Sequence, residues 1–193
     1  MIVTDSDSKL SALVKEAKDG SRKALEALAA RFHKEVFRLV YCRVFSRHDA
    51  EDLTQEIFMQ MVKSIQGLKE ETRFKAWLYR IALNRVNDFF RQRERTDTEE
   101  PIEPDNDEAF FDHNNPELLL LRKEFWLRFN AFTTQLPRQE QEVFLLRFVE
   151  QMGIAEIASV LKKNESTVKT HLYRALKKFR QNTEFRMLLQ GGL

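Results

Sequence analysis

The stretch that decides the fold is I-A-E-I-A-S-V-L-K-K-N-E-S-T-V-K-T-H-L-Y-R-A-L-K-K-F, which runs from Ile154 to Phe179. Its apolar residues recur at helical spacing in two segments, and about three residues, Lys162 to Asn164, separate them. Two helices joined by so short a turn are typical of a helix-turn-helix, and Ala158 is small where the helices would cross. The sequence therefore predicts a helical hairpin here.

The second helix of this hairpin has two chemically different faces. The apolar face consists of Val168, Leu172, Ala175, Leu176 and Phe179. The other face offers hydroxyl, aromatic and basic groups, on Ser166, Thr167, Lys169, Thr170, Tyr173, Arg174 and Lys177, with Arg180 beside them. Such groups suit base edges and phosphates in a major groove. A hairpin with a merely solvated basic face is the alternative.

The turn of the hairpin contains two informative residues. Asn164 can cap the second helix and leave free N–H groups facing a phosphate. Lys162 occupies the position where glycine usually relieves a left-handed backbone, so a positive φ there would cost about 1 kcal/mol. A metal site at His171 would need a second metal-binding side chain, and none lies near it in the sequence. We therefore interpret His171 as a surface or phosphate-contacting residue.

Upstream of this hairpin, the periodicity predicts further helices and no strand of any quality. Four are expected in the N-terminal part, over about Ser8 to Asp19, Ser21 to Phe45, Ser46 to Ile65 and Thr72 to Arg95. Two more are expected over Pro116 to Thr133 and Leu136 to Val149, before the hairpin helices at Ile154 to Leu161 and Asn164 to Phe185. The fold class is therefore predicted to be all-α, with two small helical domains.

An acidic segment separates the two domains. Between Thr96 and Glu117 there are nine acidic residues and no lysine or arginine. The lack of helical periodicity there indicates a flexible, solvated linker. We expect residues 1–95 to form one domain, 96–115 the linker and 116–193 the other domain, with the role of Phe110-Phe111 in the linker left open.

The expected third helix carries D-A-E-D-L-T-Q-E-I-F, Asp49 to Phe58. The apolar side chains that point one way, toward a core, are Ala50, Leu53, Ile57 and Met61. The other side carries polar and acidic side chains with an aromatic at the edge, on Asp49, Glu51, Asp52, Gln55, Glu56 and Phe58. These residues suit either solvent or a basic partner, whereas a carboxylate metal site would need a Glu-x-x-His pair that is missing.

The expected fourth helix carries a stripe of polar and basic residues with a tryptophan at its start. The stripe consists of Trp77, Arg80, Asn84, Asn87 and Arg91, and Arg73, Lys75, Arg93 and Arg95 add charge at the ends. The buried face is expected to consist of Phe74, Leu78, Ile81, Ala82 and Phe89. The stripe suits a phosphate backbone and unstacked bases, although a solvated face with Trp77 in the core is the alternative.

Composition narrows the class of protein. The formal net charge is only +2 in 193 residues, so bulk charge does not indicate nucleic-acid binding. The single cysteine, Cys42, excludes an internal disulfide and is expected to be a buried thiol. No apolar run resembles a signal peptide or a membrane span, so a cytoplasmic protein is expected. Neither a cofactor nor a metal is expected.

Two separate motifs resemble the conserved regions of bacterial sigma factors. The segment D-A-E-D-L-T-Q-E-I-F with R-F-K-A-W-L-Y-R-I-A-L-N-R-V-N-D-F-F-R is similar to region 2. The segments L-P-R-Q-E-Q-E-V-F-L-L-R-F-V-E, I-A-E-I-A and E-S-T-V-K-T-H-L-Y-R-A are similar to region 4. The absence of a domain between them is the mark of the extracytoplasmic-function (ECF) group of the sigma-70 superfamily.

This resemblance implies partners and residue roles. The core RNA polymerase would bind through its β′ clamp helices to the Asp49–Phe58 stripe, and through its β flap. Promoter DNA would be read and melted at the −10 element by the fourth helix and the loop Gln66 to Arg73, with Asn84 lining the pocket for a flipped base. The −35 element would be read by the hairpin, chiefly at Lys169, Thr170, Tyr173 and Arg174. A cognate anti-sigma factor is left open.

Two other functions compete with this interpretation. A transcriptional regulator that binds DNA without polymerase would explain the hairpin but not the stretch from Asp49 to Arg95. A helical enzyme would need a nucleophile–base pair, a phosphate loop or a metal set, and the sequence shows none of them. We therefore expect a protein that acts by binding and not by catalysis.

Overall fold

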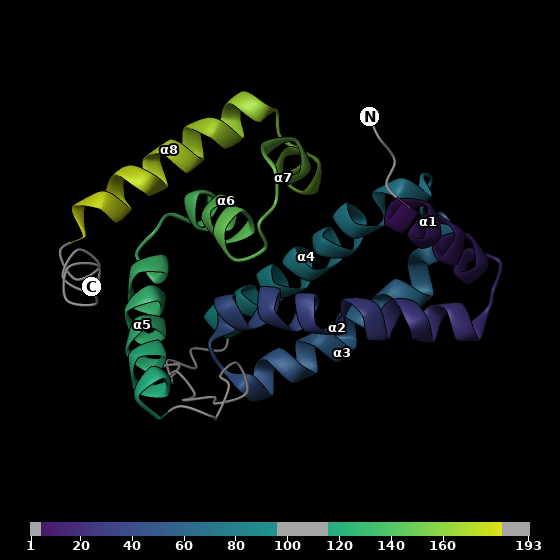
Figure 1. Cartoon of the computed structure of the whole chain (residues 1–193), viewed down its shortest axis with the longest axis horizontal. Helices are drawn as coiled ribbons and strands as arrows, with labels where there is room; N and C mark the ends of the chain where they lie inside the picture. The colour runs from purple at the N-terminus through teal and green to yellow at the C-terminus, as the bar shows by residue number, and fades with distance from the viewer. Residues whose placement is uncertain (1–4, 96–115, 183–193) are drawn as a thin grey trace. The chain divides into compact units, whose positions relative to one another are not determined.

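The computed structural model describes residues 5–95 and 116–182, and the side chains of residues 8–95 and 125–182. Within these ranges every regular element is a helix, which confirms the all-α prediction. The elements are α1 (Asp5–Lys18), α2 (Arg22–Val44), α3 (Arg47–Ser64), η1 (Ile65–Gly67), η2 (Glu71–Arg73), α4 (Phe74–Arg95), α5 (Pro116–Thr134), α6 (Arg138–Phe148), α7 (Ile154–Leu161) and α8 (Glu165–Gln181). They form two compact units, α1 to α4 and α5 to α8 (Figure 1).

The observed helix bounds differ from the expected ones at the ends. α4 begins at Phe74 and not at Thr72, because Glu71–Arg73 forms a separate 3-10 turn. α8 ends at Gln181, before the expected Phe185, and the N–H of Asn182 bonds back to the carbonyls of Lys178 and Phe179. The expected linker, residues 96–115 with Phe110-Phe111, lies outside the described residues.

The core of the first unit is built from the apolar stripes of α2, α3 and α4. Its fully buried side chains include Leu28, Leu39, Ile57, Met61 and Leu78. The rings of Phe32 and Phe74 meet with their centroids 5.3 Å apart and join α2 to α4. Burying each such side chain stabilises the fold by roughly 1.5–3 kcal/mol. Cys42 is also fully buried, as predicted.

A polar network fastens α4 to α2 at the edge of this core. The buried Tyr79 donates its hydroxyl hydrogen bond to Oε2 of Glu35 at 2.8 Å, and Nζ of Lys75 lies 3.0 Å from the same oxygen. Burial raises the pKa of Glu35, but the hydrogen bonds from Lys75 and Tyr79 and the charges of Lys75 and Arg38 outweigh it, so the pKa lies below its ordinary value of 4.5. Glu35 is therefore held as a carboxylate.

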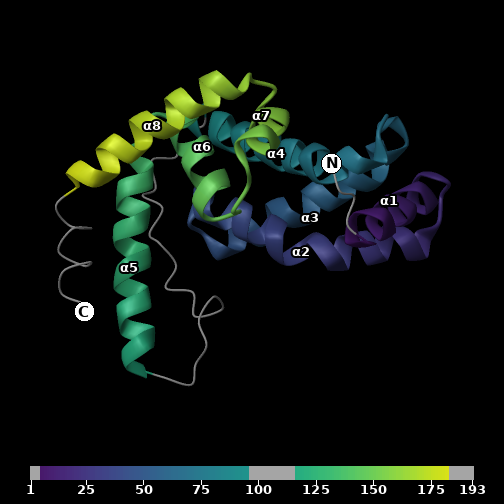
Figure 2. The same cartoon turned by 45° about the horizontal axis from the view of Figure 1, so that its top comes forward.

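The second unit has an aromatic core. Phe132 of α5 meets Phe144 of α6 and Phe179 of α8, with ring centroids 5.5 and 5.4 Å apart, mostly edge to face. Nζ of Lys178 lies 2.8 Å from Oε2 of Glu140, whose side chain is only 8% exposed, so the pair fastens α8 to α6. The turned view shows α7 and the start of α8 meeting at a tight turn (Figure 2).

Among the described residues, no helix is long and apolar enough to cross a membrane. The same residues contain no cluster of three or more His, Cys, Asp or Glu side chains that could hold a metal ion.

Candidate functional site

The turn between α7 and α8 begins with a residue in the left-handed region. Lys162 adopts the left-handed conformation, with φ 52° and ψ 43°, although it carries a side chain. This meets the condition under which the lysine costs about 1 kcal/mol relative to glycine. The N–H of Lys163 bonds to the carbonyl of Ala158 at 3.0 Å, so the turn is closed despite that cost.

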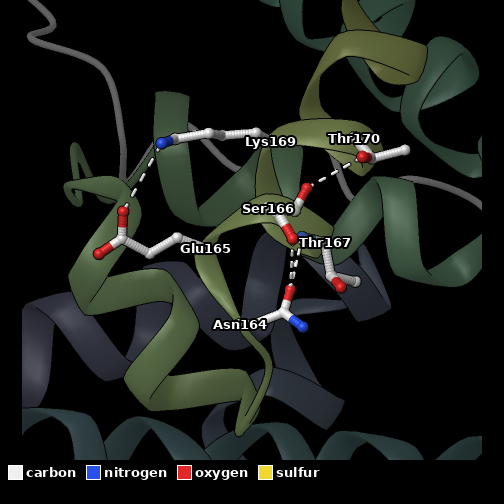
Figure 3. A network of polar contacts seen from close by, with 6 residues as sticks. All are labelled: Asn164, Glu165, Ser166, Thr167, Lys169 and Thr170. Atoms are coloured by element: carbon white, nitrogen blue, oxygen red, sulfur yellow. Dashed lines mark hydrogen bonds and ion pairs between the residues drawn. The ribbon is translucent and has the colours of Figure 1, made fainter.

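Asn164 caps α8, as the sequence predicts (Figure 3). Its Oδ1 accepts a hydrogen bond from the N–H of Thr167 at 2.7 Å and another from the hydroxyl of Ser166 at 3.0 Å. The cap takes up one of the free N–H groups of the first turn and fixes where the helix begins. Side chains further along α8 therefore project from a firmly placed backbone.

The two faces of α8 separate as the sequence predicts. Val168 and Ala175 are buried, and Leu172, Leu176 and Phe179 are partly buried against the unit. The exposed side chains of the opposite face are Ser166, Lys169, Thr170, Tyr173, Arg174 and Lys177, whereas Thr167 is partly buried. Tyr173 is 69% exposed, which is unusual for so large an aromatic and leaves its ring and hydroxyl available to a partner.

On this exposed face, the groups nearest the cap are engaged with their own helix. The hydroxyl of Thr170 donates to the carbonyl of Ser166 at 2.9 Å, and Nζ of Lys169 lies 3.7 Å from Oε2 of Glu165 (Figure 3). Both contacts are exposed to solvent and therefore weak, so a DNA phosphate or base edge can replace them at small cost. The arrangement supplies donors, acceptors and positive charge on one straight helix face.

The polar stripe of α4 also reaches solvent. Asn84 and Arg91 are exposed, and Trp77, Arg80 and Asn87 are partly buried. Trp77 is thus neither fully solvated nor part of the closed core, and its ring leans on Phe74 at 5.8 Å between centroids. One aromatic surface therefore lies beside a row of amides and guanidinium groups, as single-stranded DNA would require.

The buried face of α4 differs from the predicted one. Phe74, Leu78 and Ala82 are buried as expected, but Ile81 and Phe89 are only partly buried. The closed core instead includes Tyr79, Leu83 and Val86. The buried stripe ends at Val86, because the last turns of α4 extend beyond the core, and Tyr79 can be buried because its hydroxyl reaches Glu35.

Several basic residues expected to contact DNA have carboxylate partners within the unit. Nε of Arg73 lies 2.7 Å from Oε2 of Glu70, Lys75 pairs with Glu35, and Arg91 pairs with Asp88. The Arg73 and Arg91 pairs are local and mostly exposed, so phosphates can compete for them. Lys75 differs, because it belongs to the network that fastens α4 to α2 and also lies over the Tyr79 ring at 5.3 Å. This partner lies on another helix, so helical periodicity within α4 could not predict it.

The side chains of the acidic stripe of α3 differ in exposure and in their contacts with α4. Glu51, Asp52 and Gln55 are exposed. Glu56 is partly buried, and its Oε2 lies 2.6 Å from Nε of Arg85 on α4. The hydrogen bond to Glu56 raises the pKa of Arg85 above its ordinary value. Oδ2 of Asp49 lies 3.7 Å from Nη1 of Arg93. A partner that binds through Asp49 or Glu56 would therefore have to displace a contact with α4.

Residues that the sequence did not single out extend this surface of α3. Met59 and Val62 are 51% and 48% exposed, although both are large and apolar. Phe58 is partly buried, with its ring stacked on His33 of α2 at 6.1 Å. The sequence could have predicted this exposure, because Met59 and Val62 fall outside the apolar stripe that ends at Met61. Exposed apolar side chains beside carboxylates are typical of a protein interface.

Comparison with known proteins identifies both units. The sequence model of sigma-70 region 2 matches residues 28–96, and that of sigma-70 region 4 matches residues 128–179. Together these matches cover more than half of the chain. The ECF RNA polymerase sigma-E factor of Haemophilus influenzae is 30% identical over 172 residues, covering 85% of this chain and 89% of its own.

Other relatives agree. The ECF RNA polymerase sigma factor BldN of Streptomyces coelicolor is 34% identical over 90% of this chain, which spans 66% of the length of that protein. The fold is similar to that of CnrH, solved in complex with the cytosolic domain of CnrY, with a TM-score of 0.69 and 21% identity over 95% of this chain and 99% of the other. It is also similar to RpoE of Bartonella quintana, solved with the anti-sigma factor NepR, with a TM-score of 0.66 and 16% identity over 89% and 99%.

Proposed function

The chain belongs to the extracytoplasmic-function group of the sigma-70 family, and from that premise we propose that it binds core RNA polymerase and directs it to promoters. The observation that carries this proposal is the presence, in one chain, of a region 2 unit and a region 4 helix-turn-helix. A regulator that binds DNA by itself has use for the second but not for the first. The chain acts by binding, and we place it in the cytoplasm, where polymerase works.

We assign polymerase binding to α3. Its exposed carboxylates, on Glu51 and Asp52, would meet basic residues of the β′ clamp helices, while Met59 and Val62 would add apolar contact area. Charge complementarity of this kind accelerates association and fixes the register of the two partners. Asp49, Gln55, Glu56 and Phe58 complete the proposed surface, and the β flap would contact the second unit.

We assign −10 recognition and strand capture to α4 and the loop before it. Asn84 is exposed at the middle of the stripe, where its amide could pair with a base taken out of the stack. Trp77 would stack against bases, and Arg73, Arg80, Asn87 and Arg91 would hold the backbone. Lys75 contributes indirectly, because its partnership with Glu35 keeps α4 in place.

We assign −35 recognition to α8, with residues 1–95 and 116–193 as the two functional domains on either side of the acidic segment 96–115. Lys169, Thr170, Tyr173 and Arg174 would face base edges, and Ser166, Thr167 and Lys177 would approach the phosphates. Asn164 acts by fixing the start of the helix. A cognate anti-sigma factor is a further partner that this assignment leaves room for.

A pull-down tests this proposal directly. The purified chain is incubated with core polymerase, and the transcripts that the mixture initiates are sequenced. We expect a stable complex and a set of start sites that share upstream elements and are absent with core polymerase alone. Specific binding of the chain to duplex DNA without any complex with core polymerase would favour the independent regulator instead.

A further inference from the structure

The loop between α3 and α4, residues 65–73, is built from two 3-10 turns and tied down at both ends. Ile65 and Leu68 are buried at its start, and the N–H of Leu68 bonds to the carbonyl of Ile65 at 3.0 Å. At its end, the N–H of Arg73 bonds to the carbonyl of Glu70 at 3.0 Å, and the side chains of the same two residues form an ion pair. The exposed residues of the loop include Gln66, Gly67, Lys69 and Thr72, and Glu70 is exposed as well although it pairs with Arg73.

A contact from a distant part of the chain reaches this loop. Nζ of Lys18, in the last turn of α1, lies 2.5 Å from Oε1 of Glu71. The two side chains are only 21% and 30% exposed, so this ion pair is better shielded from solvent than the local pairs of the loop. The hydrogen bond from Lys18 is the main reason that the pKa of Glu71 lies below its ordinary value of 4.5. Lys18 therefore contacts the loop at its second 3-10 turn, Glu71–Arg73, from an element that is distant in the sequence.

The backbone around Lys18 is itself firmly placed. Val14 and Ala17, on the adjoining face of α1, are buried in the core. α1 is closed by a turn in which Gly20 has φ 93°, a value that favours glycine, and the N–H of Ser21 bonds to the carbonyl of Glu16 at 3.0 Å. The ammonium group also lies at the favourable, C-terminal end of the helix dipole. A fixed lysine thus presents one charge to a short loop.

We propose that Lys18 is a positioning residue for −10 recognition, which sets the shape of the loop 65–73 through Glu71 without contacting DNA. The inference rests on the function proposed above, in which this loop and α4 read the −10 element. If only local bonds at its ends held the loop, its exposed residues would adopt several conformations. The Lys18–Glu71 pair selects one shape and thereby sharpens the preference for one −10 sequence over others.

The test compares holoenzymes made with wild-type chain, Lys18→Met, Glu71→Gln and the swap Lys18→Glu/Glu71→Lys. Methionine keeps most of the apolar stem of lysine and removes its charge. The readout is the −10 preference, measured by transcription from a promoter library with a randomised −10 element and a constant −35 element. Because a mismatch at a directly contacted base pair typically weakens binding at least about fivefold, and Lys18 acts only through the loop, we expect both single variants to weaken the preference about threefold to tenfold. The swap should recover part of it.

Control variants separate the possible outcomes. Glu26→Gln breaks the exposed Arg22–Glu26 pair of α2, which has no part in the loop, and should leave the preference unchanged. Core binding and thermal stability are measured for every variant. An unchanged −10 preference in Lys18→Met and Glu71→Gln, in holoenzymes that still initiate at promoters, would overturn the proposal and leave the sigma function standing. A loss of thermal stability or core binding with an unchanged −10 preference would likewise overturn the proposal, because the pair would then only stabilise the fold. Failure of the wild-type holoenzyme to initiate at any shared element would instead overturn the proposed function.

Discussion

Asn84 lies on the exposed side of α4, between the buried residues Leu83 and Val86 on the core side. Its backbone is therefore fixed by packing while its amide reaches solvent, which is the arrangement that a base pocket requires. Extruding a base from the stack costs a few kcal/mol, and contacts in the pocket must offset that cost. A helix that only reads duplex DNA does not incur this cost.

Replacing Asn84 by alanine should impair strand opening and little else. The side chain is exposed and belongs to neither α3 nor α8, so core binding and −35 affinity should remain as in the wild type. Open-complex formation should fall, and a template premelted at −10 should restore part of the activity, because the unpairing cost has been removed. Permanganate footprinting of the −10 thymines on both templates measures this. Normal opening of the plain duplex by the variant would show that Asn84 is a surface residue only.

The limits of sequence reasoning are clearest at single residues. The periodicity of α4 correctly predicted that Phe74, Leu78 and Ala82 are buried, because these lie on one apolar stripe. It did not predict that Tyr79 is buried and that Lys75 is tied to Glu35, since both depend on a carboxylate 40 or more residues away. Likewise, the exposed carboxylates of α3 were foreseen, but the pairing of Glu56 with Arg85 required the helices to be placed.

At the scale of elements, α8 combines a buried face, a capped start and an exposed face of mixed chemistry. All three were predicted from the sequence, because helical periodicity and capping are local properties. The sequence analysis considered a positive φ at Lys162 without predicting it, and the structure shows a φ of 52° there. The end of α8 was placed too late, because no proline or glycine follows Gln181 until Gly191.

Substitutions on α8 distinguish base contacts from phosphate contacts. Arg174→Ala or Lys169→Ala should cost about 1–3 kcal/mol in holoenzyme–promoter affinity if the side chain reads a base, with relaxed preference at one −35 position. A phosphate contact would instead weaken all sequences alike and reduce the salt slope by roughly 1. Binding is measured as a function of salt on several −35 variants. Arg22→Ala, which removes another exposed arginine, from the first unit, is the control. If the α8 variants behave like it, α8 does not read the −35 element.

The surface of α3 can be tested by charge reversal at a single exposed position. Asp52→Arg is preferable to a change at Glu56, because arginine at position 56 would face Arg85 and disturb the contact between α3 and α4. We expect a folded protein whose association with core polymerase is strongly weakened, through repulsion from basic groups on the partner. Glu26→Arg, a reversal at an exposed carboxylate of α2, should bind normally. If Asp52→Arg bound core polymerase as well as Glu26→Arg does, α3 would not be part of the interface.

At the scale of the whole molecule, the account requires both units in one chain. Each unit has its own core, aromatic in the second and mixed in the first, and each presents one helix face of polar and basic residues. The sequence allowed this division to be expected from the acidic stretch between the two helical parts. The family matches assign one conserved region to each unit. A protein of this kind should open promoter DNA only as part of a complex with polymerase.

The most direct measurement is therefore permanganate reactivity of promoter thymines with the chain alone, core polymerase alone, and the two together, on a promoter found by transcript sequencing. The account predicts reactivity around −10 only with both proteins present. It also predicts the loss of that reactivity when the −10 or the −35 element is scrambled. Thymines that stay unreactive when the chain and core polymerase are combined would contradict the account and favour an independent DNA-binding regulator.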